Sequence, residues 1–192
     1  MCLAGRNVVL RPFEKKDSQF LEALLNGWEA LDLFRVDSLL WTSEDIVQQF
    51  GDLRSFIVEE RTERRPVGLA RIVEHNPLQK RAEIGGYLIE QQRHQGLGWE
   101  ACLLLLKYCY DYLDVARVET RVFSTNEPSL AFARTLGFRE EGTLRSYLAR
   151  GGRRIDLVVF ALLDHEFRGS CRIQKLLAAG MLEPGQPMPM ES

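Results

Sequence analysis

A loop with two glycines separates an apolar strand-like segment from an apolar helix-like segment near the middle of this chain. The loop covers residues 93–98, the strand-like segment residues 82–90 and the helix-like segment residues 99–113. Glycine lets backbone N–H groups approach an anion closely, and the start of a helix adds unpaired donors and the positive end of its dipole. The arrangement favours diphosphate binding at this loop, although an ordinary strand-to-helix turn would have the same composition.

Size, composition and charge fit one globular domain. The chain has 192 residues, of which 45% are hydrophobic, enough for a sizeable core. Its formal net charge is -2, so the whole chain offers no basic field for non-specific nucleic-acid binding. Its four cysteines form no Cys-x-x-Cys pair and its three histidines are scattered. We therefore expect neither a nucleic-acid partner nor a metal site.

No segment of the sequence has the character of a membrane or export signal. Residues 1–7 lack the apolar run of a signal peptide. The longest apolar run, at residues 102–106, is far too short to span a bilayer. We therefore expect a soluble cytoplasmic protein with reduced thiols and no membrane partner.

The spacing of apolar residues predicts a mixed series of strands and helices. Strands are expected at residues 8–12, 54–60, 67–74, 82–90, 117–123, 138–148 and 154–163, the last two joined by a glycine hairpin. Helices are expected at residues 17–25, from a cap at Thr42 to about residue 50, and at residues 99–113 and 127–136, with a further short helix within residues 28–41. This order predicts an α/β or mixed α+β domain built on a mixed sheet.

The apolar pattern defines one domain and then fades. We place that domain at residues 7–167 and a C-terminal tail at residues 168–192. Residues 183–192 are rich in proline and methionine, and we expect them to be disordered.

A series of short motifs, in order along the chain, resembles the GNAT superfamily of N-acetyltransferases. The acetyl-coenzyme A loop of that family reads Gln/Arg-x-x-Gly-x-Gly/Ala, and Arg93, Gly96 and Gly98 match its first, fourth and sixth positions. The other matching segments are Val9-Leu10-Arg11-Pro12, Ala82-Glu83-Ile84-Gly85, Arg117-Val118-Glu119, Asn126 with Ser129, Leu136-Gly137-Phe138, Glu141-Gly142-Thr143-Leu144-Arg145 and Asp156. The resemblance spans about residues 7–167 and is strongest to the ribosomal-protein N-terminal alanine or serine acetyltransferases and to the spermidine acetyltransferases.

This resemblance implies a fold and a place for a cofactor. The GNAT fold is a twisted, mostly antiparallel mixed sheet, here of about six to seven strands flanked by about four helices. Its fourth and fifth strands splay apart, and the pantetheine arm of acetyl-coenzyme A lies between them. No metal is implied. Dimers are common in the family, so a homodimer is possible.

The resemblance also implies which residues bind acetyl-coenzyme A. Its diphosphate would lie on backbone N–H groups after Arg93, and its pantetheine amides would pair with the strand before the loop. Arg93 would equally suit a solvated loop position, and Asn126 can both contact pantetheine and cap a helix. The expected cofactor-binding residues are Leu88, Ile89, Arg93, His94, Gln95, Gly96, Leu97, Gly98, Trp99 and Asn126.

Two residues match catalytic positions of relatives. Glu83 would act as a general base through water, or would pair with Arg81 or Arg71 as an ordinary strand glutamate. Ser129 would act as the acid, or would bond the local backbone. Many relatives have a tyrosine at the position of Ala133, which has no proton to give. The thiol of coenzyme A is acidic enough that no dedicated acid is required.

The acceptor side is expected to form from the early helices and the last hairpin. The expected substrate-binding residues are Trp28, Phe34, Arg35 and Tyr147, although the aromatic ones would also suit a core. Because no acidic cluster marks a polyamine site, peptide N-termini and small amines rank first as acceptors.

The sequence thus predicts an acyl-coenzyme A-dependent N-acetyltransferase that moves an acetyl group to a primary amine by direct attack in a ternary complex. Two alternatives remain open. One is a catalytically silent coenzyme A-binding or regulatory module, and the other is an acyltransferase that uses a longer acyl-coenzyme A or a carrier-protein thioester.

Overall fold

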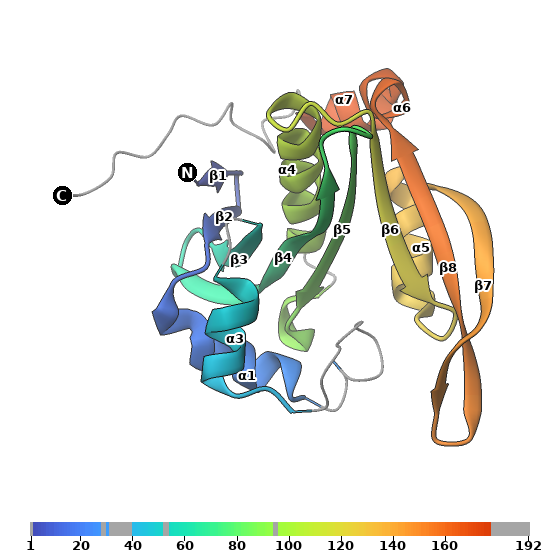
Figure 1. Ribbon diagram of the computed structural model, residues 1–192. Coiled ribbons are helices and arrows are strands. Elements are labelled where there is room, and N and C mark those ends of the chain that lie inside the picture. The colour runs from blue at the N-terminus through green and yellow to red at the C-terminus, as the bar shows by residue number, and fades with distance from the viewer. Residues whose placement is uncertain (1, 28–29, 31–39, 52–53, 94–95, 178–192) are drawn as a thin grey trace.

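The computed structural model describes residues 2–27, 30, 40–51, 54–93 and 96–177, which form one twisted sheet with helices on both faces (Figure 1). The sheet has eight strands in the order β1-β2-β3-β4-β5-β6-β8-β7. The strands are β1 (Leu3–Ala4), β2 (Val8–Pro12), β3 (Ser55–Glu60), β4 (Arg65–Asn76), β5 (Arg81–Leu88), β6 (Arg117–Phe123), β7 (Arg139–Arg150) and β8 (Arg153–Leu163). The helical elements are η1 (Lys15–Asp17), α1 (Ser18–Leu25), α3 (Ser43–Phe50), η2 (Glu90–Gln92), α4 (Leu97–Asp111), α5 (Glu127–Leu136), α6 (Asp164–Gly169) and α7 (Cys171–Leu176).

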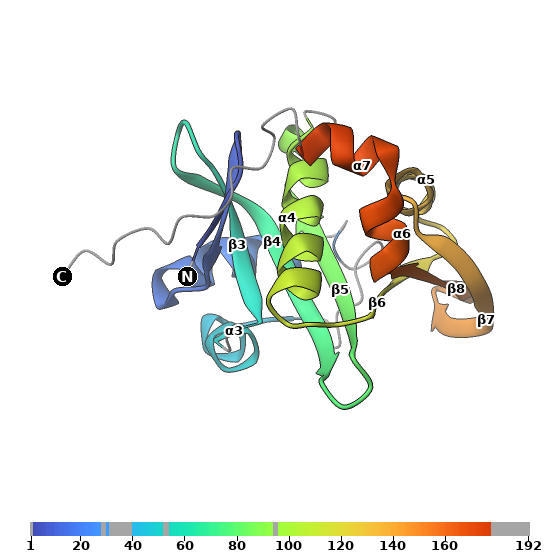
Figure 2. The ribbon, with the colours of Figure 1, turned by 90° about the horizontal axis from the view of Figure 1, so that it is seen from above.

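The two faces of the sheet bury different side chains of the same strands. Ile57 and Leu69 pack with α1 and α3, whereas Phe56 and Ala70, next to them in sequence, pack in the cluster that contains α4 and α5. This alternation explains why β3 is apolar at successive positions: both of its faces are covered. Figure 2 shows α3 on one side of the sheet and α4 with α6 and α7 on the other.

The strands β5 and β6 are the one parallel pair among the strand pairs of the described residues, and they pair only briefly. Their register joins Arg81, Ala82 and Glu83 to Arg117, Val118 and Glu119 and goes no further. Beyond this point the two strands diverge (Figure 1). We call this divergence, from Glu83 on β5 and Glu119 on β6 onward, the β5–β6 splay. It confirms the expected mixed, mostly antiparallel sheet with a splay between the fourth and fifth predicted strands.

Most predicted elements are found, and the differences have local causes. The eighth strand, β1, has only two residues and pairs with β2, so it leaves no periodic pattern. The strand β4 reaches Asn76, because a bulge near Val73 restores its pairing with β5. The predicted hairpin between β7 and β8 is confirmed, and its two glycines have φ values of 55° and 75°, which suit a tight two-residue turn.

The chain beyond Arg168, expected to be a tail, forms helix α7 as far as the described residues reach. Ser170 caps this helix by accepting a hydrogen bond from the N–H of Ile173 at 3.3 Å. The side chain of Ile173 is only 2% exposed, and Leu176 and Leu177 pack against the same core. The apolar contacts rather than a long periodic pattern hold this short helix in place. No helix in the described ranges is long and apolar enough to cross a membrane.

Candidate functional site

The strand β5 presents an edge without a strand partner along the β5–β6 splay, within the described part of the chain. On its other side the N–H of Ile89 donates to the carbonyl of Val67 at 2.9 Å. Hydrogen-bonded pairs alternate along an antiparallel ladder, so the backbone groups of Gly86 and Leu88 point away from β4. The β5 edge can therefore pair with the amides of a ligand as a further strand would.

The helix α4 begins beside this edge without a side-chain cap. Its N-cap residue, Gly96, has a φ of +82°, a left-handed conformation that glycine adopts without a steric penalty. The first helical bond runs from the N–H of Glu100 to the carbonyl of Gly96 at 3.2 Å. The N–H groups of Leu97 and Gly98 lie before that bond, so the helix offers donors and its positive dipole end to an anion.

The first turn of α4 lies against the end of β5. A Cβ placed on Gly98 would be 3.3 Å from Cδ1 of Leu88. A Cβ on Gly96 would meet nothing within 4 Å, so backbone conformation and not space requires glycine there. The two glycines of the motif therefore have different roles. His94 and Gln95, also expected to bind the cofactor, lie outside the described residues.

Arg93 connects this loop to β5. Its Nε and Nη2 donate to the carbonyl of Leu88 at 3.1 and 3.0 Å, and its guanidinium carbon lies 5.0 Å from the ring centroid of Tyr87. The side chain is therefore a clamp between loop and strand and not a solvated loop arginine. It also occupies the carbonyl of Leu88, so at this position the N–H of Leu88 is the group left for a ligand.

The helix α5 begins at the same end of the sheet, after β6 (Figure 1). Asn126 is 6% exposed, and its Oδ1 accepts a hydrogen bond from the N–H of Ser129 at 3.1 Å. Asn126 thus acts as the helix cap that the sequence suggested. The rings of Trp99 and Phe132 have centroids 5.4 Å apart, so α4 and α5 pack directly against each other.

Glu83 lies at the closed end of the splay and is 4% exposed. Its register partners are Glu74 on β4 and Glu119 on β6, so three carboxylates lie in a row across three strands. Nε of Arg121 lies 3.2 Å from Oε2 of Glu83. The carboxylate of Glu83 therefore forms an ion pair with Arg121 of β6. The parallel pairing of β5 with β6 brings the two residues together.

The pairing of Glu83 with Arg121 could not be read from the sequence, from which Arg81 or Arg71 was expected as an ordinary partner. Arg81 pairs with Glu74, its Nη2 lying 2.6 Å from Oε1 of that residue. On β6, Nε of Arg117 lies 2.8 Å from Oε1 of Glu119. Each of the three carboxylates thus has an arginine beside it, which offsets the repulsion between like charges on adjacent strands.

The remaining predicted site residues are placed as follows. Ala133, at the position where many relatives have tyrosine, is 3% exposed and belongs to the hydrophobic core. Ser129 lies half-buried in the first turn of α5. Tyr147 is 47% exposed on β7. Trp28, Phe34 and Arg35 lie outside the described residues.

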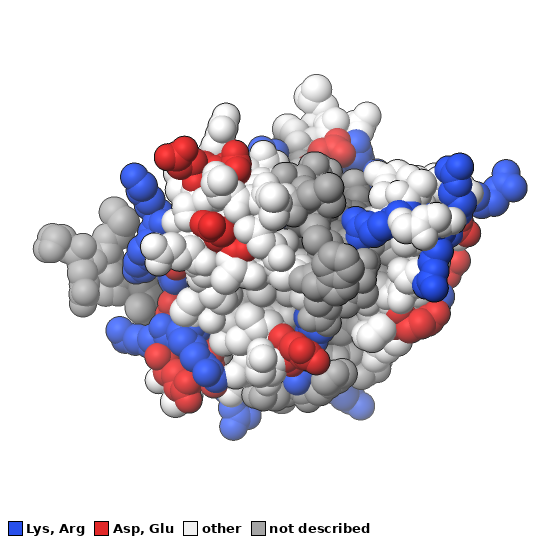
Figure 3. Space-filling model, turned by 90° about the horizontal axis from the view of Figure 1, so that it is seen from below, with Lys and Arg blue, Asp and Glu red and all other residues white. Residues whose placement is uncertain are grey.

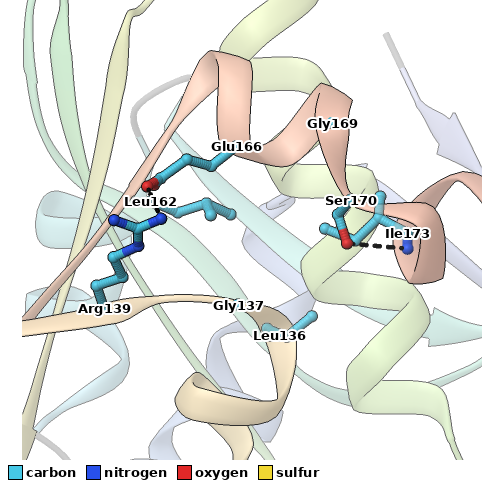
Figure 4. Close-up of a pocket in the computed structure, with 8 residues that line it drawn as sticks. All are labelled: Leu136, Gly137, Arg139, Leu162, Glu166, Gly169, Ser170 and Ile173. Carbon is cyan, nitrogen blue, oxygen red and sulfur yellow. Dashed lines mark hydrogen bonds and ion pairs between the residues drawn. The ribbon is translucent and has the colours of Figure 1, made fainter.

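A cavity of about 330 Å³ lies elsewhere, between the end of α5 and helices α6 and α7 (Figure 4). Apolar side chains, including Leu136 and Ile173, line it together with the ion pair of Arg139 and Glu166, whose atoms are 2.8 Å apart. None of the predicted site residues lines this cavity. The predicted site is therefore the splay with its two helix starts, and not this cavity.

Comparison with known proteins agrees with this geometry. Residues 7–139 match the family model described as an acetyltransferase (GNAT) domain. The chain is 30% identical over 177 residues to an uncharacterized N-acetyltransferase p20 of Bacillus licheniformis, covering 87% of this chain and 98% of the relative. It is 26% identical over 182 residues to a putative ribosomal N-acetyltransferase, YdaF, of Bacillus subtilis (strain 168), covering 88% and 97%.

A solved structure supports the fold. The spermidine N-acetyltransferase from Vibrio cholerae, in complex with CoA and spermine, is 20% identical and superimposes with a TM-score of 0.77 over 84% of this chain and 98% of that one. The family model covers more than half of the chain, and the fold, the splay and the glycine loop fit it. The chain therefore belongs to the GNAT family and is an acetyltransferase.

Proposed function

We propose that this protein transfers an acetyl group from acetyl-coenzyme A to a primary amine, on a peptide N-terminus or a small molecule. The amine would attack the thioester carbonyl directly while donor and acceptor are both bound. The observation that carries the proposal is the continuity between the β5 edge and the uncapped start of α4, which fits a ligand with amides followed by a diphosphate.

The donor's shape suits the order of these backbone groups. The pantetheine amides would pair with Gly86 and with the N–H of Leu88, since the amide of Ile89 is already bonded to Val67. The diphosphate would lie on the N–H groups of Leu97 and Gly98. Asn126 faces the donor from the other side of the splay in this proposal, while its Oδ1 continues to cap α5.

The chemistry requires a neutral amine and a polarised carbonyl, and most of the rate enhancement would come from positioning. Glu83 remains our candidate base, acting through water, and it would do so from an ion pair with Arg121. Ser129 is the candidate acid. Because Ala133 supplies no proton, departure of the coenzyme A thiolate without a protein acid is an equally good last step.

Two linked measurements test the proposal. Calorimetric titration with acetyl-coenzyme A, coenzyme A and longer acyl-coenzyme A esters would measure donor binding, for which we expect micromolar affinity. Thiol release with peptides that begin with alanine or serine, with small amines and with spermidine would then measure transfer. Donor binding without thiol release on any acceptor would favour the silent-module alternative. Faster release from a longer ester would favour the alternative donor.

The absence of both donor binding and thiol release would overturn the proposal itself. Glu83→Gln provides a test of the base, because it keeps the size of the side chain and removes the carboxylate. We expect that variant to bind acetyl-coenzyme A normally and to turn over at least about tenfold more slowly. Unchanged turnover would remove Glu83 from the mechanism.

A further inference from the structure

The hairpin of β7 and β8 carries a bulge at the level of the splay. Its register moves from the pair Leu144 and Leu157 to the pair Leu148 and Ile155, so three residues of β7 lie opposite Asp156 alone. Ser146, in the middle of the three, has a φ of +53° and donates its N–H to Oδ1 of Asp156 at 2.7 Å. A non-glycine residue holds this conformation only where its surroundings fix it.

This bulge lies next to the start of α5. The carbonyl of Asp156 accepts a hydrogen bond from the N–H of Ser124 at 2.9 Å, and Ser124 is two residues before the cap Asn126. The hairpin therefore passes the open end of the splay, and its tip projects beyond the sheet (Figure 1). In the proposed function the acceptor would approach the donor from this open end of the splay, next to the bulge.

The hairpin is strongly basic. Residues 142–163 contain four arginines, Arg145, Arg150, Arg153 and Arg154, and a single acid, Asp156. The two acids at the start of β7, Glu140 and Glu141, are each paired with an arginine of another element. The carboxylate of Asp156 accepts the N–H of Ser146 and keeps its single negative charge, which offsets only one of these four positive charges. In Figure 3, which views the molecule from below, arginine and lysine side chains lie on the side of the hairpin, together with some acids, and also on the opposite side.

Two other exposed arginines are paired. Arg134 is paired with Glu140 and Arg168 with Asp164. By contrast, no carboxylate of the described residues forms an ion pair with Arg145, Arg153 or Arg154. The hairpin thus presents positive charge that this part of the chain leaves uncompensated.

Among the described residues, the acids of β5 and β6 at the closed end of the splay are already paired with arginines. Glu83 is paired with Arg121, and Glu119 is paired with Arg117 and lies 4.0 Å from Arg121. An approaching polyamine would therefore meet uncompensated arginines outside and neutralised carboxylates inside. The same positive field would attract an anionic group.

We propose that the arginines of this hairpin recognise an anionic group, a carboxylate or a phosphate, that the acceptor carries in addition to its amine. The inference rests on the proposed function, because it assigns the acceptor class of the same site. Because the paired N–H donors of a guanidinium group bind carboxylates and phosphates alike, an experiment must distinguish the two anions.

Thiol release from acetyl-coenzyme A would be compared for two matched pairs of acceptors. The carboxylate pair is the peptide amides Ser-Ala-Glu and Ser-Ala-Gln, and the phosphate pair is phosphoethanolamine and ethanolamine, with spermidine as a cationic acceptor. We expect the anionic member of at least one pair to have a kcat/KM about tenfold above its neutral partner, the effect of one charge-assisted hydrogen bond. Which pair responds identifies the anion.

Two double variants assign that preference to the hairpin. Arg145→Gln/Arg154→Gln should remove most of the preference and leave the kcat/KM of the neutral acceptors and the KM for acetyl-coenzyme A unchanged. Arg6→Gln/Arg64→Gln removes the same charge from two exposed turns, between β1 and β2 and between β3 and β4, and should retain the anion preference. All four side chains are exposed, so the melting temperature should not move.

Three results would overturn the inference: no anion preference in either pair, a preference for spermidine, or a preference that survives in the hairpin variant. If no acceptor is turned over, calorimetric binding of the same four acceptors to the coenzyme A-loaded protein decides, and equal binding of each pair overturns the inference. Failure of the proposed function can be told apart from failure of this inference, because the protein without substitutions would then not bind acetyl-coenzyme A.

Discussion

Helices α4 and α5 begin at the same end of the sheet, on opposite sides of the splay, but they treat their first turns differently. Asn126 satisfies the start of α5 with its own side chain. At the start of α4 stands Gly96, which has no side chain to offer. A helix start that is capped from within is a structural feature, whereas one left uncapped beside a free strand edge is fitted to a ligand.

The largest effect is expected from a charge placed at the uncapped start. Gly96→Asp and Gly96→Asn impose the same left-handed strain and have nearly the same size, but only aspartate repels a diphosphate. We expect Asp to weaken acetyl-coenzyme A binding about tenfold more than Asn, measured by calorimetry. Equal affinities for the two variants would mean that the start of α4 does not hold the diphosphate.

The next effect separates two roles of Arg93. If Arg93 clamps the loop to Leu88, lysine cannot replace its paired donors, and Arg93→Lys should weaken donor binding about as much as Arg93→Gln, by roughly threefold to tenfold. If Arg93 only supplies positive charge, lysine would preserve the affinity. The dissociation constants of the two variants and the original protein decide between these roles.

At the capped start the expected effect is on stability. Asn126→Ala removes the bond to the N–H of Ser129 and should cost about 1 kcal/mol of unfolding free energy. Asn126→Asp keeps an acceptor at that position and should retain most of the stability. Urea denaturation of the three proteins checks the difference. A loss with Asp as large as with Ala would show that the amide of Asn126, and not its carbonyl oxygen, matters most.

The smallest effect is expected at the second glycine. Gly98→Ala adds a methyl group 3.3 Å from Leu88, which can shift slightly without moving the backbone of β5. We expect about a twofold to threefold rise in the KM for acetyl-coenzyme A and little change in kcat. A large fall in kcat would indicate that the loop also aligns the reacting carbonyl.

The sequence predicts those parts of the molecule whose signals are local. The bounds of α5 follow from the Asn126 cap and the Gly137 stop, and those of β2 and β6 from short apolar alternations. Helices α6 and α7 are too short to show a period, and packing of residues such as Phe167 and Ile173 decides them. Residues 28–39, expected to line the acceptor side, lie largely outside the described ranges.

Within the candidate site, too, only the features with local signals could be predicted from the sequence. The glycine loop could be predicted because its residue types and their spacing are themselves the signal. The ion pair of Glu83 with Arg121 is not, because it depends on which strands become neighbours. The direction of the backbone groups of Gly86 and Leu88 is equally unreadable, since it depends on the register of β4 with β5.

The most direct test is amide hydrogen exchange, read residue by residue, with and without coenzyme A. The account predicts slower exchange on binding at Leu88, Leu97 and Gly98, with no change at Ile89 and Ser129, whose N–H groups already have partners within the protein. Binding that leaves Leu88 and the first turn of α4 unprotected, or that protects the start of α5 instead, would contradict it.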